Sequence, residues 1–153
     1  MATRSRQPFA DGLIVLLIVD TNRIIAALLR DSTSRRILFS SEFRFMSLTL
    51  AGKEIARYAN DLIERSGHNK EMFTAVLRKI CSRIRFFDDR EIQMFTAEAK
   101  GILDSIDPKD TPFIALALAV ENDGIWSDDK HFEQQSRVHV WKTKDLLKLL
   151  GLP

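Results

Sequence analysis

Four acidic residues stand where the chain is expected to pass between secondary-structure elements. Asp20 ends the apolar run "LIVLLIV", Asp110 directly precedes apolar "TPFIALALA", and Asp129 lies in "SDD", directly after "GIW". Glu54 lies near the start of a segment with helical periodicity. Carboxylates gathered without a cation repel one another and raise some of their pKa values, whereas Mg²⁺ and Mn²⁺ prefer oxygen ligands. The set therefore predicts a divalent-metal site that could activate water for attack at phosphorus.

Each of these carboxylates has a structural explanation when it is considered alone. Asp20 could be a helix N-cap, and Asp110 could interact with the dipole of the helix that it precedes. Glu54 could be a solvated acid in the first turn of its helix, and the pair Asp128 and Asp129 could cap a short helix in "KHFEQQ". These explanations weaken when taken together, because the four positions are expected at the same edge of one sheet.

The elements that would position these residues alternate between strands and helices. Residues 13–19 are apolar at every position, which is typical of a central strand buried on both faces. Further strands are expected in "RFMSL", "IRFF", "GIWS" and "VHVW", and helices over residues 22–30, 50–66, 73–84 and 143–151. Residues 111–120 are apolar almost all round and predict a buried helix. This order favours an α/β fold, whose ligands bind beyond the carboxyl ends of the strands.

Two helices carry more detailed expectations. Residues 50–66 are predicted to form one helix that buries Ile55, Tyr58 and Leu62 on a single face and ends at Gly67. Asp88 and Glu91 resemble a capping box that opens another helix.

Composition indicates one domain and gives little evidence about partners. The chain has 153 residues, of which 45% are hydrophobic and 29% charged, and its formal charge of +2 is too small to indicate a partner. Residues 1–12 are predicted to be a mobile arm, and residues 13–153 a single domain. The apolar run at 13–19 is too short to span a bilayer and is not followed by a leader cleavage site, so a cytoplasmic protein without a membrane partner is expected.

The ordered set of motifs resembles the PIN-domain ribonucleases. "IVDTN", Glu54 in the third helix, "DPKDTPFIALALA" and "IWSDDKHF" occur in the order found in that family and span nearly the whole chain. The resemblance implies a three-layer α/β/α domain with a central parallel sheet of about five strands. It also implies hydrolysis of RNA phosphodiester bonds with one or two Mg²⁺ or Mn²⁺ ions. Many members are toxins of type II toxin–antitoxin pairs, so a small antitoxin partner and a homodimer are expected.

The resemblance assigns roles to individual residues. Asp20, Glu54, Asp110 and Asp129 match the family's four acidic positions and are expected to be the catalytic residues and metal ligands. Ser127 matches the hydroxyl position of the last motif, and Asn22 stands where polar residues often support the first acid. Asp128 occupies the variable position of that motif. It is a candidate for an additional metal or water-mediated contact, or for a helix cap.

Basic residues give candidate RNA contacts. Arg78, Lys79 and Arg83 lie around one amphipathic helix, and Arg35 and Arg36 lie near the first helices. Lysine and arginine contact phosphates in RNA complexes, although a solvated helix face is the default interpretation. The three histidines show no helical metal-ligand spacing and are not assigned to the site.

Two alternatives differ in chemistry. The first is a catalytically inactive PIN fold that binds RNA or a protein. The second is another acid-pocket α/β protein that handles phosphoryl groups. A phosphatase of the haloacid type would need Asp-x-Asp after the first strand, where this chain has Asp20-Thr21-Asn22. Retention of all four acidic positions favours an enzyme.

Overall fold

Five strands form one parallel sheet in the order β3-β2-β1-β4-β5. The structure, a computed structural model, describes residues 14–29 and 32–153. The strands are β1 (Val15–Val19), β2 (Phe43–Leu48), β3 (Ile84–Phe87), β4 (Ile125–Trp126) and β5 (Val140–Trp141). Between and after them lie α1 (Thr21–Leu29), α2 (Ser32–Leu38), α3 (Thr49–Arg57), α4 (Ala59–Ser66), α5 (Lys70–Cys81), α6 (Asp89–Ile92), the 3-10 helix η1 (Gln93–Phe95), α7 (Thr96–Leu103), α8 (Thr111–Ala119), the 3-10 helix η2 (Phe132–Gln134) and α9 (Thr143–Leu149).

The central position of β1 explains its sequence. It pairs with β2 on one side and β4 on the other, and four of its five residues are buried. A strand enclosed in this way has no solvated face, so it carries no alternation of polar and apolar residues. The expectation for residues 13–19 is confirmed over the part that the structure describes.

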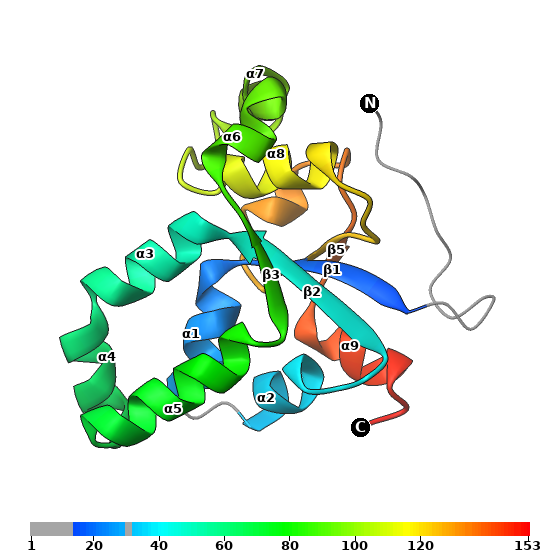
Figure 1. Ribbon diagram of the computed structural model, residues 1–153. Helices are drawn as coiled ribbons and strands as arrows, with labels where there is room; N and C mark the ends of the chain where they lie inside the picture. Colours follow the sequence, from blue (N-terminus) through cyan, green and yellow to red (C-terminus); the bar gives the residue numbers. More distant parts are fainter. Residues whose placement is uncertain (1–13, 30–31) are drawn as a thin grey trace.

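Helices cover the sheet on both faces and give the predicted three-layer architecture (Figure 1). Helix α8 packs against β1 and β2, and α6 and α7 pack against α8. Every residue from Phe113 to Leu118 is buried, which confirms the prediction of a helix that is apolar all round. Helices α1, α2, α5 and α9 lie on the other side of the sheet (Figure 1).

Residues 50–66 differ from the prediction. The chain forms two helices, α3 and α4, which meet at Tyr58 with φ −103° and ψ 16°. Tyr58 is 55% exposed, so the prediction that it shares a buried face with Ile55 and Leu62 is wrong. Both α3 and α4 contact α1.

The capping box predicted from Asp88 and Glu91 is confirmed, and it opens α6. The predicted arm, residues 1–12, lies outside the described residues. Within the part of the chain that the structure describes, no helix is long and apolar enough to cross a membrane.

The strand order reverses between β1 and β4, and this reversal positions the predicted site. Because the sheet is parallel, the carboxyl ends of all its strands lie at one edge. Asp20 directly follows β1, and Ser127 directly follows β4. The two segments are neighbours, since the Asp20 backbone N–H lies 3.5 Å from the Trp126 carbonyl oxygen.

We expect Gly124→Ala to destabilise the protein by about 2 to 4 kcal/mol in chemical denaturation. Gly124 has φ 133°, and its carbonyl accepts the Ile18 N–H at 2.9 Å. A Cβ at this position would lie 2.5 Å from the His139 carbonyl oxygen and 2.8 Å from Trp141 Cδ1. Both the backbone conformation and the space therefore require glycine.

Gly52→Ala is the matched control, because Gly52 is an exposed helical residue at which an added Cβ would meet no neighbouring atom within 4 Å. We expect this change to raise stability by about 0.5 to 1 kcal/mol, since alanine is the better helix former. Equal effects of the two substitutions would contradict the role given to Gly124.

Candidate active site

Asp20 is held by both of its carboxylate oxygens. Oδ1 accepts the backbone N–H of Arg23 at 2.9 Å, so Asp20 caps α1, and Oδ2 accepts the hydroxyl of Ser127. The residue is 4% exposed. Burial raises the pKa of Asp20 to about 6, although the Ser127 hydroxyl and Arg23 act in the opposite direction. The capping and site interpretations of Asp20 are therefore compatible.

Ser127 connects two of the predicted acids. It is fully buried, donates to Asp20, and accepts the backbone N–H of Asp129 at 3.0 Å. One hydroxyl at the end of β4 thus fixes the Asp20 carboxylate and the loop that carries Asp129. This arrangement supports the prediction that Ser127 assists the acids.

Asp110 lies at the start of α8 without capping it. Its side chain accepts no hydrogen bond from the helix, and its Oδ2 is buried without a hydrogen-bond partner. Burial, followed by the charges of Asp107, Asp129 and Asp20, raises the pKa of Asp110 to about 7, although the His131 side chain, 3.6 Å away, acts in the opposite direction. Three of the four predicted carboxylates therefore share one electrostatic environment, and the repulsion expected from the sequence is present.

The structure adds Asp107 and His131 to this site, and neither was assigned from the sequence. His131 Nδ1 lies 2.9 Å from Asp107 Oδ2, 3.3 Å from Asp129 Oδ1 and 3.6 Å from Asp110 Oδ2. Both residues stand inside the motifs quoted above, Asp107 three positions before Asp110 and His131 two positions after Asp129. The spacing Asp-x-x-Asp before a buried helix was the available signal.

The donor set suits a cation. Asp107, Asp110 and His131 each offer one ligand atom, and these atoms all lie within 4.8 Å of one another. The buried Oδ2 of Asp110 is the atom that most needs a positive partner. Carboxylate oxygens suit Mg²⁺ and Mn²⁺.

Glu54 and Asn22 are placed differently from the other predicted residues. Glu54 is half-buried on α3. It does not belong to the ligand group of Asp107, Asp110 and His131, and its charge is not among those that raise the pKa of Asp110. Its assignment as a metal ligand stays a prediction. Asn22 is exposed, and the groups that bond to Asp20 are Ser127 and Arg23 instead.

Asp128 contacts α1 and α9. Its Oδ1 accepts the Thr143 backbone N–H at 2.8 Å, and its Oδ2 accepts the Thr143 hydroxyl at 2.6 Å and lies 2.9 Å from Arg23 Nη1. Both oxygens thus have partners in the fold, so a metal contact by Asp128 is not favoured. It does not cap η2 either; it joins the loop that carries Asp129 to two helices.

Two predicted RNA contacts have structural roles. Arg35 donates to the carbonyls of Ala27 and Leu28 at the end of α1. Arg83 donates to the carbonyls of Leu38, Ser40 and Phe43, which line the connection from α2 to β2. These guanidinium groups satisfy backbone carbonyls and so help to hold the fold, and their assignment to RNA stays a prediction.

The remaining predicted RNA contacts lie far from the acids. Arg36, Arg78 and Lys79 are exposed, but they are on α2 and α5, which lead into the amino ends of β2 and β3. The acids lie at the opposite edge, across strands of four to six residues, or roughly 13 to 20 Å. These three residues stay predictions for RNA contacts away from the acidic cluster.

We expect Asp128 and Arg23 to be energetically coupled. Their separation of 2.9 Å and shared contact with Thr143 predict a coupling free energy of about 1 kcal/mol in a double-mutant cycle of Asp128→Ala and Arg23→Ala. The expected coupling free energy is small because the Asp128 side chain is 38% exposed, so solvent screens the attraction between the two charges. Urea unfolding of the four proteins measures it.

The matched control is the exposed pair Asp61 and Arg65. These residues are one turn apart on α4, and their charged atoms lie 3.7 Å from each other. Its coupling should be about 0.3 kcal/mol. Additive effects of the Asp128 and Arg23 changes would show that the two residues do not act together.

Comparison with known proteins agrees with the geometry. A search of the curated proteins gives no match. The family model described as "PIN domain" matches residues 18–150, which includes the whole sheet from the end of β1 and every acidic residue discussed above. The parallel order β3-β2-β1-β4-β5 and the acids at its reversal point are thus found in a chain that belongs to the PIN-domain family.

Proposed function

We propose that this protein is a metal-dependent endoribonuclease that hydrolyses phosphodiester bonds of RNA. Family membership supports a nuclease-type fold. The observation that carries the proposal is the convergence of Asp20, Asp107, Asp110 and Asp129 on one environment, with the buried Oδ2 of Asp110 left without a hydrogen bond. Such crowding is costly unless a cation or protons compensate it.

The site residues would have different roles in RNA hydrolysis. Asp107, Asp110 and Asp129 would hold one or two Mg²⁺ or Mn²⁺ ions, with Asp20 beside them and Glu54 as a further predicted ligand. The bound metal would lower the pKa of a coordinated water and neutralise charge that develops on the phosphate. One of the carboxylates beside the metal would accept the proton of the attacking water. Ser127 would hold the Asp20 carboxylate and the loop that carries Asp129 in fixed positions relative to each other.

The biological setting is part of the proposal. The resemblance to toxins supports a cytoplasmic RNA target, a small antitoxin partner and a homodimer. A neighbouring reading frame that encodes a small DNA-binding protein would support this setting. The ribonuclease proposal does not depend on it.

We expect Asp20→Asn to reduce Mn²⁺-dependent RNA cleavage by at least about 100-fold, because loss of groups that only support metal ligands already costs 10- to 100-fold. Asparagine keeps an oxygen that can cap α1, so stability should change by no more than about 1 kcal/mol. Cleavage of a labelled single-stranded RNA, with and without chelator, measures the effect.

Asp61→Asn is the control, since Asp61 is an exposed acid on α4. It should cleave like the unchanged protein. Full activity of purified Asp20→Asn, or cleavage that persists in chelator, would overturn the proposed function.

A further inference from the structure

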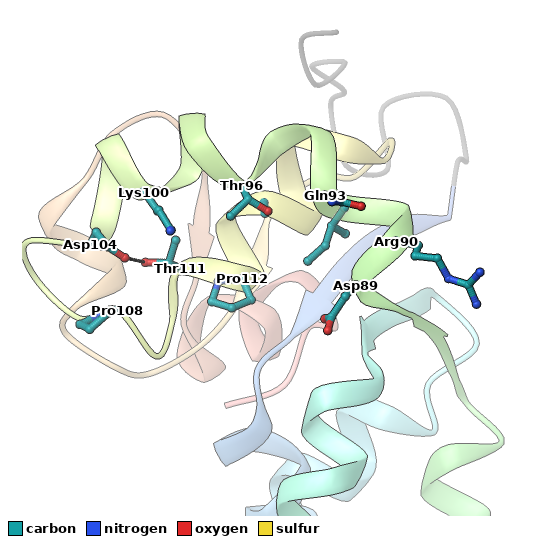
Figure 2. Close-up of a pocket in the computed structure, with 11 residues that line it drawn as sticks. Asp89, Arg90, Gln93, Thr96, Lys100, Asp104, Pro108, Thr111 and Pro112 are labelled. Atoms are coloured by element: carbon teal, nitrogen blue, oxygen red, sulfur yellow. Dashed lines mark hydrogen bonds between the residues drawn. The ribbon is translucent and has the colours of Figure 1, made fainter.

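A cavity of about 440 Å³ lies beside the acidic cluster, between α8 and the segment formed by α6, η1 and α7. Figure 2 shows its lining residues. Its volume is within the range of small-molecule sites and is sufficient for one nucleotide. No role in the proposed hydrolysis uses this cavity.

The cavity and the acidic cluster share one loop. Residues 104–112 contribute Asp107 and Asp110 to the cluster, and Asp104, Pro108 and Thr111 to the cavity. The Thr111 hydroxyl donates to Asp104 Oδ1 at 3.0 Å, and Thr111 directly follows Asp110. One short loop therefore joins the cavity and the cluster, so a nucleotide in the cavity and a phosphate at the acids could belong to one RNA strand.

The lining combines an apolar floor with a polar rim. Ile92 and Ala115 are buried, and the Pro112 ring lies among the polar residues in Figure 2. Lys100 is directed toward the Asp104–Thr111 pair, and Thr111 directly follows Asp110. Asp89 and Gln93 lie at the other end of the cavity.

These features suit a nucleobase better than a purely apolar ligand. A flat base could lie on the Pro112 side of the floor, and Gln93 offers both a donor and acceptors to its edge. Lys100 could contact the adjoining phosphate. The Asp89 carboxylate can only accept hydrogen bonds when ionised, so it would favour a base with an exocyclic amino group over uracil, whose N3–H donor lies between two carbonyl oxygens that repel a carboxylate.

We propose that this cavity binds the nucleotide adjoining the scissile phosphate and favours adenine, guanine or cytosine over uracil. The proposal rests on the proposed ribonuclease function for its biological meaning. In place of an exocyclic amino group, uracil offers Asp89 only its N3–H, which lies between two carbonyl oxygens. A single exposed hydrogen bond of this kind corresponds to a preference of roughly threefold to tenfold.

Nucleotide binding by the metal-free protein tests the proposal. Nucleoside monophosphates of the four bases would be titrated separately in chelator, and the backbone amide signals followed by NMR. We expect saturable shifts at Ile92, Lys100 and Ala115, with uridine monophosphate binding roughly threefold to tenfold more weakly than the others.

Three variants sharpen the test. Gln93→Trp should fill the cavity and abolish the shifts, whereas Met94→Trp should not, because the neighbouring Met94 is 90% exposed and does not line the cavity. Asp89→Asn should bring uridine monophosphate to within twofold of the others, since the amide both donates and accepts. The capping box uses Asp88 and Glu91, so this change leaves the cap of α6 in place.

The outcomes separate this proposal from the proposed function. Absence of saturable shifts at the cavity, equal binding of the four bases, or unchanged binding by Gln93→Trp would overturn the proposal, even if the protein cleaves RNA with Mn²⁺. Conversely, binding that follows the predicted base order would support it even if cleavage were absent, because the titration needs neither metal nor catalysis.

Discussion

Repulsion among carboxylates at the reversal point of the sheet is the constraint on which the site depends. Asp20 and Asp129 come from the segments that follow β1 and β4, and Asp107 and Asp110 come from the loop before α8. Burial and mutual charge raise the pKa values of Asp20 and Asp110 to about 6 and about 7. The fold holds these groups together despite this cost, which makes a cation the simplest physical reason for the arrangement.

The surrounding contacts fix the carboxylates without neutralising them. Ser127 bonds to Asp20 and to the Asp129 backbone, and Asp128 joins the same loop to Arg23 and Thr143. The two aspartates of "SDD" therefore have different roles. Asp129 faces His131 in the cluster, while Asp128 contacts α1 and α9. His131 lies among these carboxylates, 2.9 Å from Asp107 and 3.3 Å from Asp129, and offers a further ligand atom for a metal.

The sequence predicted what depends on local pattern. The apolar run of β1, the all-apolar α8 and the order of elements determine the sheet, and three of the four predicted acids share the site. It did not predict contacts that depend on side-chain direction. Helical charge spacing could not show that Arg35 and Arg83 satisfy distant backbone carbonyls, and histidine spacing could not place His131 among carboxylates from another loop. Tyr58 likewise fits a helical period but lies at a bend.

Thermal unfolding of the metal-free protein and of Asp110→Asn tests whether repulsion among the carboxylates lowers stability and whether a cation relieves it. A raised pKa means that the folded state binds more protons between about pH 4 and pH 7, so these groups lower stability as pH rises through that window. We expect Asp110→Asn to unfold at a higher temperature than the unchanged protein at pH 8 and at a similar one at pH 5. We also expect Mn²⁺ at pH 8 to raise the unfolding temperature of the unchanged protein more than that of the variant. Equal or lower stability of Asp110→Asn at pH 8, with no stabilisation of the unchanged protein by Mn²⁺, would contradict both expectations.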